Sequence, residues 1–289
     1  QFDPSIFIDD DGRIYLYSGF CPTNREVDSF GRKFVGCHMC ELEQDMLTVR
    51  RGPILTISRE SSAAAGAVYF EAPSMRKING RYYLVYSARN TGLYYFISDR
   101  PDKDFRFGGR IHSTSDVGMN GYSEEEPCYP MGNTHGGLVE LNGRYYIFDH
   151  RHTNNSSFCR QGVAEQINID AQGLIAQVES TSCGLNNGWL IGEGTYPAYI
   201  ACVLYYEKTV PIDDRTACIT QDGEDRESLP GQYIRGISDG CIVGYRYFQG
   251  KELSNIRLTL RGRMKGTLYV TCHEEGGRMQ DPEKIAVGS

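Results

Sequence analysis

Three short motifs place a polar side chain directly before a run of β-forming residues. They are Asp3-Pro4, Glu71-Ala72-Pro73 and His135-Gly136-Gly137. Two carboxyl groups and an imidazole that face one cavity could donate and accept protons, which is the chemistry of general acid and base catalysis. The motifs are far apart in the chain, so this chemistry requires a fold that brings them together.

Each motif precedes a hairpin pattern that occurs three times. An Asp-Gly or Asn-Gly turn follows apolar residues and leads into aromatic and β-branched ones. The copies are Asp11-Gly12-Arg13-Ile14-Tyr15-Leu16, Asn79-Gly80-Arg81-Tyr82-Tyr83-Leu84 and Asn142-Gly143-Arg144-Tyr145-Tyr146-Ile147. Such turns are strong hairpin signals, because both central residues take positive φ. The turn glycines are 68 and 63 residues apart, which leaves room for about four strands in each repeat.

Four-stranded sheets repeated around a centre form a β-propeller, which we predict for residues 1–178. The first strands of the sheets would then line a central funnel where the three motifs converge. A β-sandwich with recurring hairpins is the alternative, since Asn-Gly hairpins occur in any antiparallel fold. Closed propellers have roughly four to eight blades, and only about three are present here. We therefore expect further N-terminal blades, either on a longer chain or on a separate N-terminal fragment.

The repeat ends before residues 179–289, which we predict to be a second, β-sandwich domain. Gly184-Leu185-Asn186-Asn187-Gly188 is taken as the junction. Short strand candidates at regular spacing indicate a sandwich. These candidates are 198–204, 217–220, 241–245, 256–260 and 267–270.

Composition excludes several classes of function. The 289 residues include 30 Lys and Arg against 37 Asp and Glu, a net charge of −7 that disfavours a nucleic-acid partner. No apolar run reaches the roughly 20 residues of a membrane span. Ten cysteines are scattered along the chain, and the Cys37-His38-Met39-Cys40 pair has no second pair to complete a zinc site. We expect reduced thiols and a cytoplasmic location.

The three motifs also occur in longer segments with a family resemblance. The segments are Asp3-Pro4-Ser5-Ile6-Phe7-Ile8-Asp9-Asp10-Asp11-Gly12, Tyr69-Phe70-Glu71-Ala72-Pro73-Ser74-Met75-Arg76-Lys77 and Asn133-Thr134-His135-Gly136-Gly137-Leu138-Val139-Glu140. Residues 1–178 resemble the family-43 glycoside hydrolases, most closely the branch of arabinofuranosidases and β-xylosidases. The resemblance implies an all-β, five-bladed propeller that inverts configuration at pentosyl linkages. Residues 179–289 resemble, with weaker motifs, a family-6 carbohydrate-binding module.

The resemblance implies that Glu71 is the general acid. The apolar stretch Val68-Tyr69-Phe70 could desolvate this carboxyl group and keep it protonated near neutral pH. Phe70 is expected to contact the substrate. Asp3 is expected to modulate the pKa of Glu71 through like-charge proximity, with the general base as the alternative role. The resemblance implies that the base is an Asp-Pro aspartate of a first blade, which this sequence does not contain.

Two further residues match positions of the family. His135 corresponds to a histidine near calcium or another hydrated cation, and a structural histidine is the alternative. Arg160, in Phe158-Cys159-Arg160-Gln161, corresponds to an arginine that contacts the sugar. Its planar set of donors suits sugar hydroxyls, although an ion pair between blades is an alternative.

The function that follows is an exo-acting, inverting α-L-arabinofuranosidase. Its substrate would be a pentose-containing oligosaccharide derived from arabinoxylan or arabinan. A β-xylosidase of the same family is the first alternative. A non-catalytic carbohydrate-binding propeller is the alternative from another class, favoured if no base carboxylate stands opposite Glu71.

Overall fold

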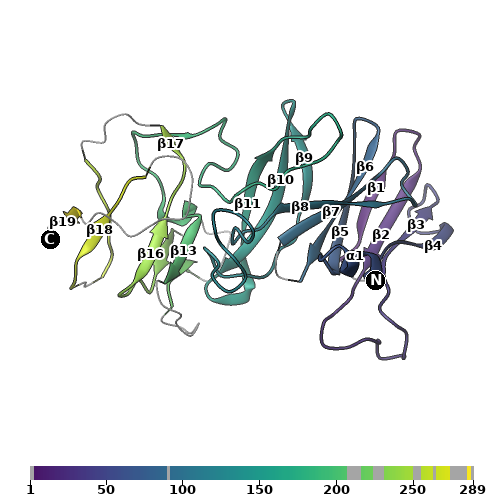
Figure 1. Cartoon of the computed structure of the whole chain (residues 1–289), viewed down its shortest axis with the longest axis horizontal. Helices are drawn as coiled ribbons and strands as arrows, with labels where there is room; N and C mark the ends of the chain where they lie inside the picture. Colours follow the sequence, from purple (N-terminus) through teal and green to yellow (C-terminus); the bar gives the residue numbers. More distant parts are fainter. Residues whose placement is uncertain are drawn as a thin grey trace.

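The computed structural model describes residues 3–89, 92–206, 216–223, 231–249, 255–262, 265–273 and 285–287. Three antiparallel sheets lie in a row along the long axis of the molecule, and short strand pairs follow towards the C-terminus (Figure 1). The prediction of an all-β fold is confirmed. None of the helices in the described ranges is long and apolar enough to cross a membrane.

The sheets follow one another in chain order, and neighbouring strands in the sequence are neighbours in each sheet. The first sheet contains β1 (Ser5–Ile8), β2 (Ile14–Gly19), β3 (Gly36–Leu42) and β4 (Val49–Ser58). The second contains β5 (Tyr69–Ile78), β6 (Arg81–Ala88), β7 (Gly92–Ser98) and β8 (Arg106–His112). The third contains β9 (Gly137–Leu141), β10 (Arg144–Thr153) and β11 (Ser156–Ile167). A short helix, α1 (Arg59–Ala64), leads from the first sheet to the second. Each sequence repeat is therefore the first hairpin of one sheet.

The three hairpin turns are not identical. Asn79-Gly80 and Asn142-Gly143 are two-residue turns in which all four residues have positive φ, between 51° and 78°. In the turn of the first repeat only Gly12 has a positive φ, of 80°. There the Asp9 N–H donates to Arg13 O and the Gly12 N–H donates to Asp9 O, each at 2.9 Å. The expectation of two positive φ values was wrong for this turn, because its loop is longer.

The second sheet is buried on both faces, as shown by the alternation along β6. One set of β6 side chains packs with residues of the first sheet, and the other set packs with residues of the third. The first set is Tyr82, Leu84, Tyr86 and Ala88, and the second is Tyr83 and Val85. As a result β5 contacts both β1 and β9, so the first strands of the three sheets lie close together.

The C-terminal part consists of two-stranded pairs. They are β12 (Leu190–Ile191) with β17 (Phe248–Gln249), β13 (Val203–Tyr206) with β16 (Cys241–Gly244), β14 (Cys218–Gln221) with β15 (Gln232–Arg235), and β18 (Leu268–Val270) with β19 (Ile285–Val287). Two facing sheets are not formed by the described residues, so the sandwich domain over 179–289 stays a prediction. A 3-10 turn, η1 (Ala198–Ile200), replaces the start of the strand expected at 198–204.

The strand predicted at 256–260 was wrong. This segment has no strand conformation, although Ile256, Leu258 and Leu260 alternate with polar residues. All three side chains are about half exposed, and no partner strand lies beside them in the described part of the chain. Alternation predicts a strand only where a neighbouring strand completes the hydrogen bonds.

The C-terminal part shares a core with the long connection between β8 and β9. Tyr122, Cys128 and Tyr129 of that connection pack with residues 202–204, 217 and 219. The backbone is joined as well, since the Leu204 N–H donates to Cys128 O at 2.7 Å. The segment that follows residue 178 is thus held against the loop that leads to His135.

We predict that Gly136→Ala destabilises the fold, because β9 and β10 approach closely at this point. A Cβ at Gly136 would clash with the backbone carbonyl of Phe148, whereas a Cβ at Gly162 of β11 would meet nothing within 4 Å. The expected loss in the free energy of unfolding is about 1–3 kcal/mol for Gly136→Ala. Urea denaturation measures it, and Gly162→Ala is the matched control. Equal effects of the two variants would contradict the close approach.

Candidate active site

The three predicted motifs lie at the same place in each sheet. Asp3 precedes β1, Glu71 is near the start of β5, and His135 precedes β9. Because β5 packs against β1 and β9, these strand starts are neighbours. The Nδ1 atom of His135 lies 4.0 Å from Oδ2 of Asp3. Residues separated by more than 130 positions are thereby brought to one site.

Glu71 is placed by a local irregularity of β5. The pairing between β5 and β6 shifts register on both sides of Glu71, and Ala72 has a positive φ of 61°. Burial raises the pKa of the Glu71 carboxyl to about 7, and the negative charge of Asp3 adds to the increase. The positive charge of Arg160 acts in the opposite direction. The carboxyl group can therefore hold a proton near neutral pH, as a general acid requires.

Phe70 directly precedes Glu71 in the chain, and the charge of Arg160 acts on the Glu71 carboxyl group. The Phe70 ring is half-buried against Phe20 at a centroid distance of 5.5 Å, and its carbonyl accepts the Cys21 N–H at 2.7 Å. Arg160 is on β11, and its Nη2 donates to Oδ1 of Asn133 at 3.4 Å. Since this partner is neutral, the guanidinium charge is not cancelled by that contact. Contacts of either residue with a sugar stay predictions.

The surroundings of His135 do not form a protein-built calcium cage. Its side chain is 44% exposed, and its ring contacts Asp3 and the His150 ring, whose centroid is 5.9 Å away. Among the described residues, no three His, Cys, Asp or Glu side chains are arranged to hold a metal ion. Calcium takes six to eight oxygen ligands. The described residues therefore do not form a dedicated calcium site, the hydrated ion expected near His135 stays a prediction, and no chemical step is derived through it.

A buried carboxylate behind His135 was missed by the sequence reasoning. Asp149 of β10 accepts the backbone N–H of His135 at 3.1 Å and that of His150 at 2.7 Å. Its other oxygen faces the ring of His112 at 3.0 Å. A signal was present, because Asp149 directly follows the apolar run 145–148 within one strand. Its partners could not be named without the tertiary structure.

A hollow of about 680 Å³ lies elsewhere, at the hairpin ends of the first two sheets. Its lining includes Arg13, Tyr15, Arg51 and Asp102. These residues are close to the turns that follow β1 and β7, whereas Asp3 and Glu71 are at the opposite strand ends. We locate the candidate site at Glu71, because a desolvated carboxyl group beside a second carboxylate is suited to proton transfer.

We predict opposite pKa shifts from two substitutions at this site. Asp3→Asn removes a negative charge and should lower the pKa of Glu71 below about 7. Arg160→Gln removes a positive charge and should raise it. The carboxyl resonance of Glu71, followed by carbon NMR against pH, measures both changes. Shifts in the same direction, or no shift with Asp3→Asn, would show that these charges do not act on Glu71.

Several relatives are similar to this chain. A "Xylosidase/arabinosidase" from Thermoclostridium stercorarium is 41% identical over 284 residues, covering 93% of this chain and 58% of that protein. A "Beta-xylosidase" from Xylanibacter ruminicola is 28% identical over 200 residues, covering 62% of this chain and 58% of the relative. This chain thus spans about 58% of the length of these two relatives. A crystal structure of a family-43 β-xylosidase/α-arabinofuranosidase from a compost microbial metagenome, in complex with xylotriose, aligns at 24% identity. It covers 61% of this chain and 57% of that one, with a TM-score of 0.46.

The family assignment rests on the part of the chain that forms the three sheets. The model of "Glycosyl hydrolases family 43" matches residues 1–175. That range contains Asp3, Glu71, His135 and Arg160, all of which the sequence reasoning had selected. By this match over more than half of its length, the chain belongs to glycosyl hydrolase family 43.

Proposed function

We propose that this chain provides the general acid of an inverting, exo-acting α-L-arabinofuranosidase. The observation that carries the proposal is the half-buried Glu71 carboxyl, whose pKa of about 7 is set by burial and by Asp3. Glycoside hydrolysis requires one carboxyl group that is protonated beside the leaving oxygen. Membership of family 43 makes this the reaction class in which such a group has a role.

In the proposed mechanism, Glu71 protonates the glycosidic oxygen as the bond to the sugar breaks. An inverting enzyme needs a second carboxylate across the sugar, roughly 6.5–9.5 Å from the acid, to activate water. We assign Asp3 to the modulation of Glu71, because its charge acts on the pKa of the acid. The base is then a carboxylate of a further blade in a five-bladed propeller, on a longer chain or a separate fragment.

The proposed substrate is a pentose-containing oligosaccharide from arabinoxylan or arabinan. Arg160 would donate to sugar hydroxyls, and Phe70 would line the pocket beside Glu71. A β-xylosidase is the second candidate, favoured by relatives named "Xylosidase/arabinosidase" and "Beta-xylosidase". Residues 179–289 would form the carbohydrate-binding sandwich. A hydrated calcium ion near His135 is kept as a proposal from the family resemblance alone.

We predict that Glu71→Gln abolishes hydrolysis and leaves sugar binding intact. Glutamine keeps the shape of the side chain and removes the proton donor, so kcat should fall by about 10²–10⁴. Release of pentose from α-1,5-arabinobiose and xylobiose measures activity and separates the two candidate substrates, because the sugar leaving group of each needs the proton. Calorimetry with arabinose and xylobiose measures binding.

The matched control for this experiment is Glu140→Gln, because Glu140 is an exposed carboxylate of β9. This variant should retain full activity. Unchanged hydrolysis by Glu71→Gln would defeat the assignment of the acid. Sugar binding without hydrolysis by the wild-type protein with its complete propeller would favour the non-catalytic alternative.

A second prediction concerns the pH dependence of kcat/KM. The acid is active only while protonated, so activity should decline as pH rises through the Glu71 pKa of about 7. Asp3→Asn should move this decline to lower pH, since the substitution lowers the pKa of Glu71. If Asp3 were the general base, Asp3→Asn would instead remove activity at every pH. The pH profiles of the two proteins therefore distinguish the two roles.

A further inference from the structure

We propose that Asp149 is a positioning residue, which fixes the backbone of His135 at the site. A buried chain of polar contacts behind Asp149 extends this support to the C-terminal part of the molecule. The effect on catalysis rests on the proposed function, whereas the restraint of the His135 backbone can be tested without it. Asp149 is fully buried and is therefore not a group that touches substrate.

The Asp149 carboxylate is held by three donors. Oδ1 accepts the N–H groups of His135 and His150, at 3.1 and 2.7 Å. Oδ2 is 3.0 Å from Nδ1 of His112. A buried carboxylate is unfavourable unless it is fully hydrogen-bonded and paired, and these contacts meet both conditions. Because one oxygen accepts both backbone N–H groups, His135 is tied to the middle of β10.

His112 extends the support to the second sheet and beyond. It is the last residue of β8, and its side chain is 1% exposed. Its Nε2 is 3.1 Å from the hydroxyl of Ser180, and that hydroxyl donates to Ser113 O at 3.0 Å. The hydroxyl hydrogen is thus used, so the His112 ring donates from both nitrogens and carries the positive charge that pairs with Asp149.

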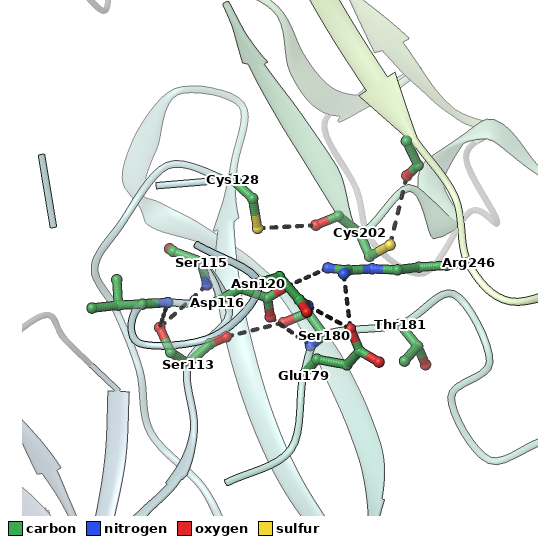
Figure 2. Close-up of polar contacts among 12 residues, drawn as sticks. Ser113, Ser115, Asp116, Asn120, Cys128, Glu179, Ser180, Thr181, Cys202 and Arg246 are labelled. Atoms are coloured by element: carbon green, nitrogen blue, oxygen red, sulfur yellow. Dashed lines mark hydrogen bonds and ion pairs between the residues drawn. The ribbon is translucent and has the colours of Figure 1, made fainter. Parts of the chain in front are cut away.

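The chain of contacts continues into the C-terminal part, as Figure 2 shows. The Ser180 N–H donates to Oδ1 of Asp116 at 2.7 Å. The other oxygen of Asp116 pairs with Arg246, whose Nη1 also binds Oε2 of Glu179 at 2.8 Å. At the interface between the 113–136 connection and the residues after 178, the Asp116 side chain is fully buried and that of Arg246 is 14% exposed. Removing one partner of such a pair strongly destabilises the fold, because the other charge is left unpaired away from water.

The position of His135 matters because its ring faces Asp3 at 4.0 Å, and Asp3 acts on Glu71. A shift of about 1 Å in a catalytic arrangement can lower the rate on the order of 100-fold. Asp149 is the side chain that holds the His135 N–H. Its effect on catalysis should therefore pass through His135.

The test is a double-mutant cycle of Asp149→Asn with His135→Ala, measured as kcat/KM on a 4-nitrophenyl pentoside. Asp149→Asn alone should lower kcat/KM on the order of 10-fold to 100-fold. In the His135→Ala background the same change should have an effect below about 3-fold, because the imidazole whose position depends on Asp149 is already absent. Losses that multiply in the double variant would overturn the proposal.

The matched control is Glu165→Gln. Glu165 is a buried carboxylate of β11 in the same sheet, but its oxygens bind the N–H and hydroxyl of Thr181, at 2.5 and 2.7 Å. This variant should lower the melting temperature and change kcat/KM by less than about 2-fold. A loss equal to that of Asp149→Asn would mean that any buried carboxylate of this sheet has the same effect, and the proposal would fail.

Hydrogen exchange gives a readout that does not need activity. In Asp149→Asn the amides of residues 134–136 and of His150 should exchange at least about 10-fold faster, while the rest of β10 and β11 keeps its wild-type protection. If Asp149→Asn does not fold, Ser180→Ala replaces it, since it removes only the hydroxyl that His112 binds. Unchanged exchange at His135 overturns the positioning role, whereas a wild-type protein with its complete propeller that is inactive on all pentosides defeats the proposed function alone.

Discussion

The burial of the Glu71 carboxyl group next to the charge of Asp3 is the feature on which the proposed chemistry depends. Water would solvate the Glu71 carboxyl and screen it from Asp3, so that Glu71 would ionise near its ordinary pKa. At the starts of β1 and β5, burial removes part of that screening and the Glu71 pKa rises to about 7. This arrangement opposes folding at neutral pH, so the packing of the sheets must hold it.

That packing comes from the second sheet, which is buried on both faces. Along β6, alternate side chains enter two different cores, one with the first sheet and one with the third. Neither neighbouring sheet can shift without exposing aromatic and aliphatic surface, and burial of such surface stabilises by roughly 25 cal/mol per Å². Close contact at Gly136 then brings the His135 backbone against β10. The site is therefore a consequence of how the sheets stack.

The residues after 178 also pack against the connection between β8 and β9. Cys128 and Leu204 pack in one apolar cluster, and a backbone hydrogen bond joins them. The Asp116–Arg246 ion pair lies at the same interface. The residues after 178 therefore support the connection that ends at His135.

Local rules were enough to predict much of the fold. Asn-Gly turns and alternating aromatic residues act over a few positions, so the three hairpins and the all-β class could be read directly from the chain. The sequence of 256–260 alternates equally well and forms no strand, because pairing depends on a neighbour that local pattern does not specify. The first turn at Asp9–Arg13 also differed, since its length is set by the register of β1 and β2.

By itself, then, the sequence determined the three hairpins, the order of the motifs and the identity of the residues with reactive groups. Only the tertiary structure decided that Asp3, Glu71 and His135 meet, that Arg160 opposes Asp3 at the acid, and that Asp149 and His112 support the site from behind. The physical reason is that turn type and side-chain alternation act between near neighbours in the chain. Burial and electrostatic fields are summed over residues that become neighbours only when the sheets pack.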